Sequence, residues 1–110
     1  MKYLFDSKGQ HIANEVNKQL HSITGNNIGH FLLDYNFFID MNGYYLGEII
    51  LENRLMYHTN NGYKSICLGN YGNYGNVGNY GNPGNYGSFG IISDYKDVEI
   101  DKLKLNLYQN

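Results

Sequence analysis

The amino-acid sequence predicts an all-β protein: four repeated β-hairpins in a pseudo-symmetric ring or barrel-like body, then an ordered tract of glycine triplets and C-terminal strands. Three observations lead to this fold class. The 110 residues include 12 Tyr, a residue favoured in strands, and 14 Gly, a residue favoured in turns. A turn pattern recurs through the first part of the chain, and glycine then stands at every third position. The length fits a single domain, 1–110, which we divide into a hairpin body (1–67), a triplet tract (68–91) and C-terminal strands (92–110).

Three segments of the body align without gaps, with the sequences LFDSKGQHIA (4–13), LHSITGNNIG (20–29) and FIDMNGYYLG (38–47). Each has Asp or Ser three residues before a Gly. The short polar side chain can accept a hydrogen bond from a backbone N–H two residues later and so begin a turn. The glycine can take the positive φ that a type I turn with a following bulge requires. The residues in these two roles are Asp6, Ser22 and Asp40, and Gly9, Gly25 and Gly43. We expect a fourth copy, with one inserted residue, at MYHTNNGYKSI (56–66).

Apolar and aromatic residues flank these turns, so we expect strands on both sides. Residues 10–21 allow a competing helical interpretation, because Ile12, Val16 and Leu20 have the spacing of one helix face. The common register of the copies favours strands. One hairpin cannot bury its own apolar face, whereas several packed around a common axis can. We place the densest apolar run, residues 49–51, near the centre of the body.

The triplet tract reads LGN YGN YGN VGN YGN PGN YGS FGI. Three interpretations of this tract are open. Its low complexity favours disorder, whereas its period of three fits a polyproline II helix with all glycines on one edge. The third alternative is an extended strand or a series of stacked turns. We expect order, because a flexible spacer does not need its aromatic residues in strict phase. Such a tract spans roughly 75 Å, so it must bend, wrap around the body or project onto another chain. We expect contact with neighbouring copies to order it.

A row of exposed aromatic rings would be a large apolar patch on a monomer, so we expect a homo-oligomer, with a tetramer as one candidate order. The residues of this candidate interface or ligand surface are Tyr71, Tyr74, Tyr80, Tyr86, Phe89, Gly75 and Gly78. After the tract, residues 98–107 alternate between apolar and polar, which indicates one or two amphipathic strands.

Composition argues against several classes of function. The net charge is −2 and 16% of residues are charged, so we expect no nucleic-acid partner and no membrane partner. No apolar run is long enough for a secretion signal or a membrane span, and we expect a cytoplasmic protein. The single cysteine, Cys67, cannot form an internal disulfide.

Catalytic patterns are missing from the sequence. The four histidines lack metal-ligand spacing and are expected at the surface or in turns; no nucleophile elbow or phosphate-binding loop is present. Asp40 and Glu48 could face each other as a carboxylate pair, but a turn explains Asp40 fully. An ion pair or a solvated strand face accounts for Glu48 and Arg54. We therefore expect no catalytic residue, no metal and no cofactor.

The chain resembles the four-fold beta flower proteins, a family of small bacterial proteins. The resemblance is carried by YLFDSKGQHIANEVN, FIDMNGYYLGEIILENRLMY and the tract GNYGNYGNVGNYGNPGNYG, which together cover most of the chain. It implies a β fold with a four-fold arrangement, within one chain or among four chains. It implies no activity and therefore no catalytic residues.

These observations favour a non-enzymatic, self-associating structural or interaction protein, whose glycine triplets pack between subunits. The alternative is a ligand-binding module that uses the tract tyrosines. Carbohydrate is the ligand class this alternative favours, because aromatic rings stack on sugars and Asn amides can bond to their hydroxyls.

Overall fold

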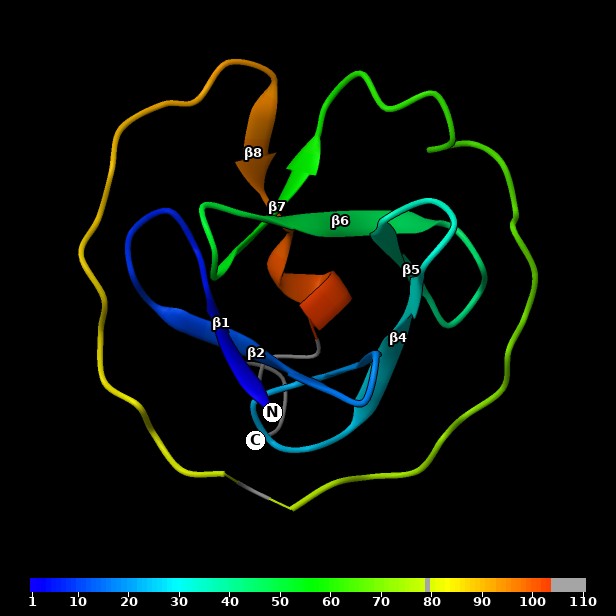
Figure 1. Cartoon of the computed structure of the whole chain (residues 1–110), viewed down its shortest axis with the longest axis horizontal. Coiled ribbons are helices and arrows are strands. Elements are labelled where there is room, and N and C mark those ends of the chain that lie inside the picture. The colour runs from blue at the N-terminus through cyan, green and yellow to red at the C-terminus, as the bar shows by residue number, and fades with distance from the viewer. Residues whose placement is uncertain (79, 104–110) are drawn as a thin grey trace.

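The computed structural model describes residues 1–78 and 80–103, with only the backbone described for Ile100. It has eight strands and one 3₁₀ helix (Figure 1). The strands are β1 (Lys2–Phe5), β2 (His11–Val16), β3 (Gln19–His21), β4 (Asn27–Leu32), β5 (Phe37–Asp40), β6 (Tyr45–Ile50), β7 (Arg54–His58) and β8 (Tyr95–Asp97), and the helix is η1 (Ile100–Leu103). The prediction of an all-β fold is confirmed, and the helical alternative for residues 10–21 is wrong, because β2 and β3 occupy them.

The strands form one sheet that closes into a barrel. Each strand from β2 to β8 pairs antiparallel with its predecessor in sequence. Closure comes from a parallel pairing of β1 with β7 at Phe5 and Arg54, where the Phe5 N–H donates to the carbonyl of Asn53 at 2.9 Å. Seven strands therefore make a closed barrel, and β8 adds to the free part of β7. Closure removes the exposed sheet edges that would otherwise pair with other chains.

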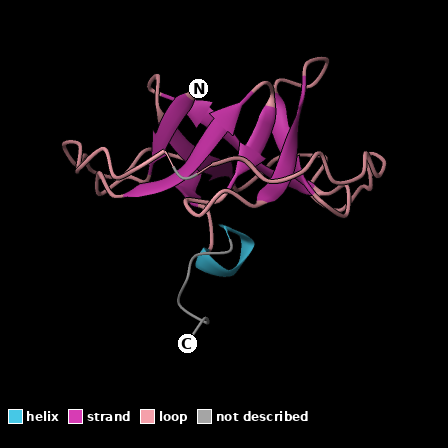
Figure 2. Cartoon of the chain, turned by 90° about the horizontal axis from the view of Figure 1, so that it is seen from below, coloured by secondary structure: helices cyan, strands magenta, loops and turns pink. Residues whose placement is uncertain are grey.

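The core fills the inside of the barrel. Its members are buried side chains of every strand from β1 to β7, together with two residues that follow β8. They are Leu4, Ile12, Ala13, Leu20, Ile28, Phe38, Leu46, Leu55, Val98 and Leu103. Figure 2 shows η1 at one end of the barrel, where its Leu103 is 1% exposed. The apolar run at residues 49–51 is not central as expected: Leu51 is 58% exposed at the β6–β7 turn.

The turns after β1, β3 and β5 are built alike. In the first, an Asp6 carboxylate oxygen accepts from the backbone N–H groups of Lys8 and Gln10, each at 2.9 Å. Ser22 accepts from Asn26 in the second, and Asp40 accepts from Asn42 and Tyr44 in the third. The glycines three residues after these side chains have φ values of +87°, +98° and +93° at Gly9, Gly25 and Gly43. A register shift interrupts the strand pairing next to each turn.

The C-terminal part of the fold differs from the expected one. The segment 56–66 does not form a hairpin of its own; β7 pairs with β8 instead, with Met56 opposite Asp97. Residues 63–66 of this segment form no strand, and Ile66 is 48% exposed. Residues 98–103 do not continue as a strand either: Val98 and Leu103 belong to the core, and η1 occupies the last four of these residues. The predicted strand positions Leu105 and Leu107 lie outside the described residues.

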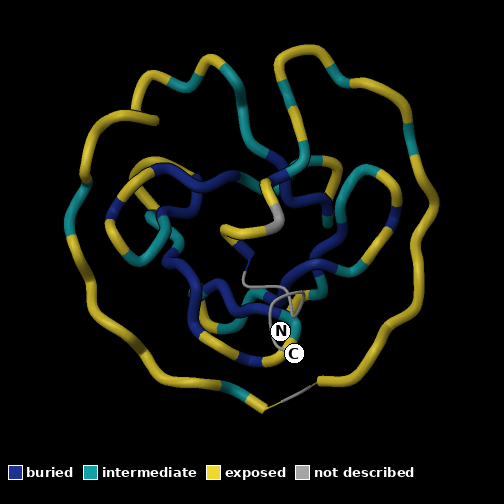
Figure 3. The backbone as a smooth tube through the Cα atoms, turned by 180° about the vertical axis from the view of Figure 1, so that it is seen from behind, coloured by how far each residue is buried: buried dark blue, intermediate teal, exposed yellow. Residues whose placement is uncertain are grey.

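Residues 68–91, which we call the belt, run around the outside of the barrel (Figure 1). At each hairpin turn, a belt N–H donates a hydrogen bond to the carbonyl of the turn glycine. The pairs are Leu68 to Gly43 at 2.8 Å, Val77 to Gly25 at 2.9 Å and Tyr86 to Gly9 at 2.8 Å. The donors are nine residues apart, which is three triplets. In Figure 3 the belt is mostly exposed and the barrel mostly buried. The belt therefore wraps around the barrel of its own chain.

Three triplets of the belt contain a local turn made by an Asn side chain. The side-chain oxygens of Asn70, Asn73 and Asn82 accept from the N–H of the glycine two residues later, at 2.7–2.9 Å. The glycines at 69, 72, 75, 81 and 84 have φ between +82° and +114°. A polyproline II helix needs φ near −75°. These five glycines therefore rule out that alternative for their triplets, and they explain why Asn and Gly recur two residues apart.

We expect Gly25→Ala to lower the free energy of unfolding by at least about 2 kcal/mol, because φ of +98° is costly for alanine. Its Cβ would also lie 2.3 Å from the carbonyl oxygen of Val77. Gly62→Ala is the matched control, since a Cβ at Gly62 meets nothing within 4 Å. Urea unfolding followed by circular dichroism measures both. Equal stability of the two variants would contradict the close approach of belt and turn.

Candidate functional site

The belt carries the residues that the sequence analysis singled out. Tyr71, Tyr74, Tyr80 and Tyr86 are 46%, 63%, 41% and 57% exposed, and Phe89 is half-buried. Because the belt encircles the barrel, these rings do not form one patch. Tyr71 and Tyr74 line a shared cavity, while Tyr86 and Phe89 lie at the far end of the belt against Arg54. The candidate surface is therefore a rim of separate rings around the molecule.

The belt glycines leave backbone open to the outside. A Cβ at Gly75 or Gly78 would meet nothing within 4 Å. The same is true of Gly72, Gly81, Gly84, Gly87 and Gly90. Within one chain, the glycines that another backbone approaches closely lie in the turns and strands of the barrel and not in the belt.

Arg54 fixes the last part of the belt to the barrel. Its side chain is 8% exposed, and its guanidinium donates to the carbonyls of Asp6 and Gly87 at 2.9 and 2.6 Å. The guanidinium carbon lies 5.6 Å from the ring centre of Tyr86 and 4.9 Å from that of Phe89. It makes no ion pair with a carboxylate among the described residues, so the sequence interpretation of an ion pair or a solvated face is wrong for Arg54. Its partners, distant in sequence, could not be found from the neighbouring residues.

His30 is the buried polar centre of a cavity of about 260 Å³ beneath the first part of the belt. Its ring is 3% exposed, and Nδ1 lies 2.5 Å from Gln19 Oε1, to which it donates. The rings of Tyr71 and Tyr74 meet the imidazole edge-on, with centres 5.7 and 5.2 Å away. Nε2 has no hydrogen-bond partner in the described structure. Burial lowers the pKa of the His30 imidazole, and the Gly72 backbone offsets part of this effect.

His21 lies under the next stretch of the belt. It is 2% exposed, and its Nε2 lies 3.3 Å from the carbonyl of Gly75. The Asn27 side chain beside it accepts from the Tyr74 N–H at 2.9 Å. The expectation of surface or turn histidines is therefore wrong for His21 and His30, which sit between barrel and belt. Within the described part of the chain, no group of three or more His, Cys, Asp or Glu could hold a metal ion.

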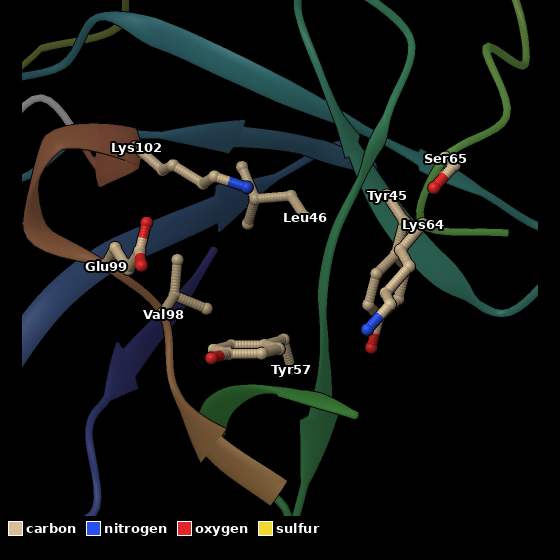
Figure 4. A pocket seen from close by; sticks show the side chains of 8 residues that line it. All are labelled: Tyr45, Leu46, Tyr57, Lys64, Ser65, Val98, Glu99 and Lys102. Atoms are coloured by element: carbon tan, nitrogen blue, oxygen red, sulfur yellow. The ribbon is translucent and has the colours of Figure 1, made fainter. Parts of the chain in front are cut away.

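A second cavity, of about 280 Å³, lies beside β6, β7 and the segment that leads into η1 (Figure 4). The Tyr45 hydroxyl donates to Glu48 at 2.5 Å and accepts from the His58 N–H at 2.8 Å. Burial and the Glu48 carboxylate raise the pKa of Tyr45 far above its ordinary range, so this hydroxyl keeps its proton. Asp40 is bonded to its own turn and Glu48 to Tyr45, so the two carboxylates hold different partners.

No protein-family model, no curated protein and no solved structure matches this chain. The resemblance to the four-fold beta flower proteins therefore stays an expectation. Among the described residues, no helix has both the length and the apolar character needed to cross a membrane.

We expect Arg54→Lys to lower the stability of the protein by about 2 kcal/mol, because lysine cannot bond to two carbonyls in a fork while lying against two rings. Hydrogen exchange should show faster opening at Tyr86 and Phe89, whose N–H groups donate to Gly9 and Ser7. Protection at Val77, on the opposite part of the belt, serves as the internal control. Unchanged exchange at Tyr86 would show that Arg54 does not hold the belt.

The lowered pKa of His30 predicts a pH dependence of stability. The unfolded state takes up a proton near pH 6.5 and the folded state takes it up only at lower pH, so stability falls as pH drops below about 6.5. Well above that pH the His30 imidazole is neutral in both states, so it adds no pH dependence to the free energy of unfolding. NMR titration of the imidazole should give a midpoint below that of a histidine peptide, and His30→Gln should flatten the stability profile between pH 7.5 and 5.5. A midpoint at or above the peptide value would contradict the prediction.

Proposed function

We propose that this is a non-enzymatic, self-associating structural or interaction protein, whose belt packs against another copy of the chain. The observation that carries the proposal is the combination of a fixed backbone and exposed rings. The belt is tied to the barrel at three turns, yet four of its tyrosines are 41–63% exposed. A tyrosine on a fixed backbone loses little conformational freedom on binding, which is why such residues dominate interfaces.

The charge of the belt supports a partner identical to itself. Residues 68–91 contain no Asp, Glu, Lys, Arg or His. In a symmetric contact the same surface faces itself, so a charged belt would set like charges against each other. An uncharged belt avoids this repulsion and also the cost of removing charges from water.

We also infer that the four-fold arrangement lies within one chain. β7 and β8 form the fourth antiparallel pair, after β1–β2, β3–β4 and β5–β6. On this interpretation the whole stretch 59–94 is the loop of the fourth hairpin, and it travels past the turns of the other three. An oligomer is then not needed to complete the barrel, and its order is independent of the four-fold arrangement.

Gly78→Ala tests whether the belt glycines contact another copy of the chain. The new Cβ points into open space, and φ at Gly78 lies outside the range that only glycine tolerates well, so the barrel should keep its stability. Gly75→Ala would be ambiguous, because φ there is +91°. We expect the wild-type chain to form an oligomer in light scattering after size exclusion, and Gly78→Ala to raise the dissociation constant by at least about tenfold.

Leu51→Asn is the control for this experiment. Leu51 is exposed on the β6–β7 turn, away from the belt, and its φ of +49° suits asparagine. Loss of association in the control as well as in Gly78→Ala would point to a contact elsewhere. A wild-type chain that stays monomeric at high concentration would overturn the proposal.

A second candidate function is a ligand-binding module, as the tract tyrosines suggested. The observation in its favour is that Tyr71 and Tyr74 line the His30 cavity together with residues of the barrel. Carbohydrate was the ligand class expected from sequence, and the chemistry of this cavity allows a sharper choice of class.

A further inference from the structure

We propose that the His30 cavity binds a methylated ammonium group, the cationic head of a small organic molecule or of a modified lysine. The inference rests on the second candidate function and is independent of self-association. Three kinds of observation carry it: the placement of three tyrosine rings, the charge of the lining, and the hydrogen bonds already made by its polar groups.

Tyrosines from two parts of the chain line the cavity. Tyr71 and Tyr74 come from the belt, and Tyr35 comes from the loop between β4 and β5. Each ring is held by another ring: Tyr35 stacks on Phe37 with centres 5.5 Å apart, and the belt tyrosines meet His30 edge-on. Tyr71 is fixed further by a bond from its hydroxyl to the Leu68 carbonyl at 3.3 Å. The faces of such rings carry negative potential and attract quaternary ammonium ions.

The lining carries negative charge only. Asp34 is its one charged side chain among the described residues, and the carboxylate makes no hydrogen bond or ion pair there. The lining has no lysine or arginine, and burial keeps the His30 imidazole neutral at pH 7. An anion would therefore meet an unopposed carboxylate, whereas a cation would meet that carboxylate among three tyrosine rings.

Some polar groups of the cavity already have hydrogen-bond partners, while the Asp34 carboxylate and the Tyr74 hydroxyl have none among the described residues. Gln19 Oε1 accepts from His30 Nδ1 and, at 3.5 Å, from Asn27. His30 Nε2 is covered from solvent, and the Tyr71 hydroxyl donates a hydrogen bond to the Leu68 carbonyl. A sugar ring needs several directional bonds to replace those it makes with water. A methylated ammonium needs no such bonds and is attracted by the unopposed carboxylate and the tyrosine rings, so this cavity suits it better than the carbohydrate expected from sequence.

The volume of about 260 Å³ lies just below the usual range for small-molecule sites. The cavity therefore suits a single head group, with the remainder of the molecule outside. A site of this size with one carboxylate should bind weakly, in the millimolar range.

The test is an NMR titration at pH 7.5 with choline, using 3,3-dimethyl-1-butanol as its neutral isostere and glucose as the sugar. We expect choline to shift the ring signals of Tyr35, Tyr71 and Tyr74, and the isostere to bind roughly tenfold more weakly. Asp34→Asn should weaken choline binding by a similar factor without disturbing the fold, because Asp34 has no partner to lose. Tyr74→Leu should abolish the preference for the cation, and Tyr80→Leu, in the belt but outside the cavity, should leave it unchanged.

Four results would overturn the inference, and they separate it from the function on which it rests. Equal binding of choline and its isostere would show an apolar pocket with no selection for charge. Unchanged choline affinity in Asp34→Asn would remove the carboxylate from the site. Binding of glucose without choline would keep the ligand-binding function and reject the cation. No shift with any of the three molecules at 100 mM would reject both (100 mM being roughly tenfold above the weakest affinity expected). In every case self-association is measured separately with Gly78→Ala.

Discussion

The belt can reach the barrel only because three hairpin turns have no side chain at the point of contact. At Gly9, Gly25 and Gly43 a Cβ would lie 2.0, 2.3 and 2.3 Å from a belt carbonyl oxygen. The same three glycines have positive φ and accept the belt hydrogen bonds. One residue at each turn therefore meets two demands: it reverses the chain between two strands, and it leaves room for another backbone. Any side chain there would disturb both the hairpin and the belt.

The belt contacts with the three turns recur at a constant spacing of nine residues. Eighteen residues separate Leu68 from Tyr86, the donors at the third and first turns (86 − 68 = 18). Because nine residues are a whole number of triplets, each hairpin turn meets a belt residue that directly precedes a glycine. This explains why the phase of the repeat is kept without interruption.

The turns and strands could be predicted because their causes are local. Asp6 and Gly9 are three residues apart, and each acts on its own segment of chain. The path of the belt could not be predicted in the same way, since Gly25 and Val77 meet only in the folded molecule. The fourth strand pair was misplaced for the same reason: the residue opposite Met56 is Asp97, on the far side of the belt. The roles of Arg54 and His30 also depend on belt residues more than thirty positions away.

Between its three contacts with the turns, the belt is held to the barrel by single hydrogen bonds, such as those from the Tyr74 N–H to Asn27 and from the Tyr3 hydroxyl to the Tyr80 carbonyl. In three triplets a glycine N–H donates to an Asn side-chain oxygen, and a Cβ on seven of the belt glycines would meet nothing within 4 Å. Ordering each residue costs about 1–2 kcal/mol of conformational entropy, and a single hydrogen bond returns only about 1 kcal/mol. Burial of the rings is the larger favourable contribution available, and within one chain Tyr74 and Tyr86 remain more than half exposed. A partner that covers these rings would add that contribution where the belt most lacks it, which is the physical reason to look for function at this rim and not inside the barrel.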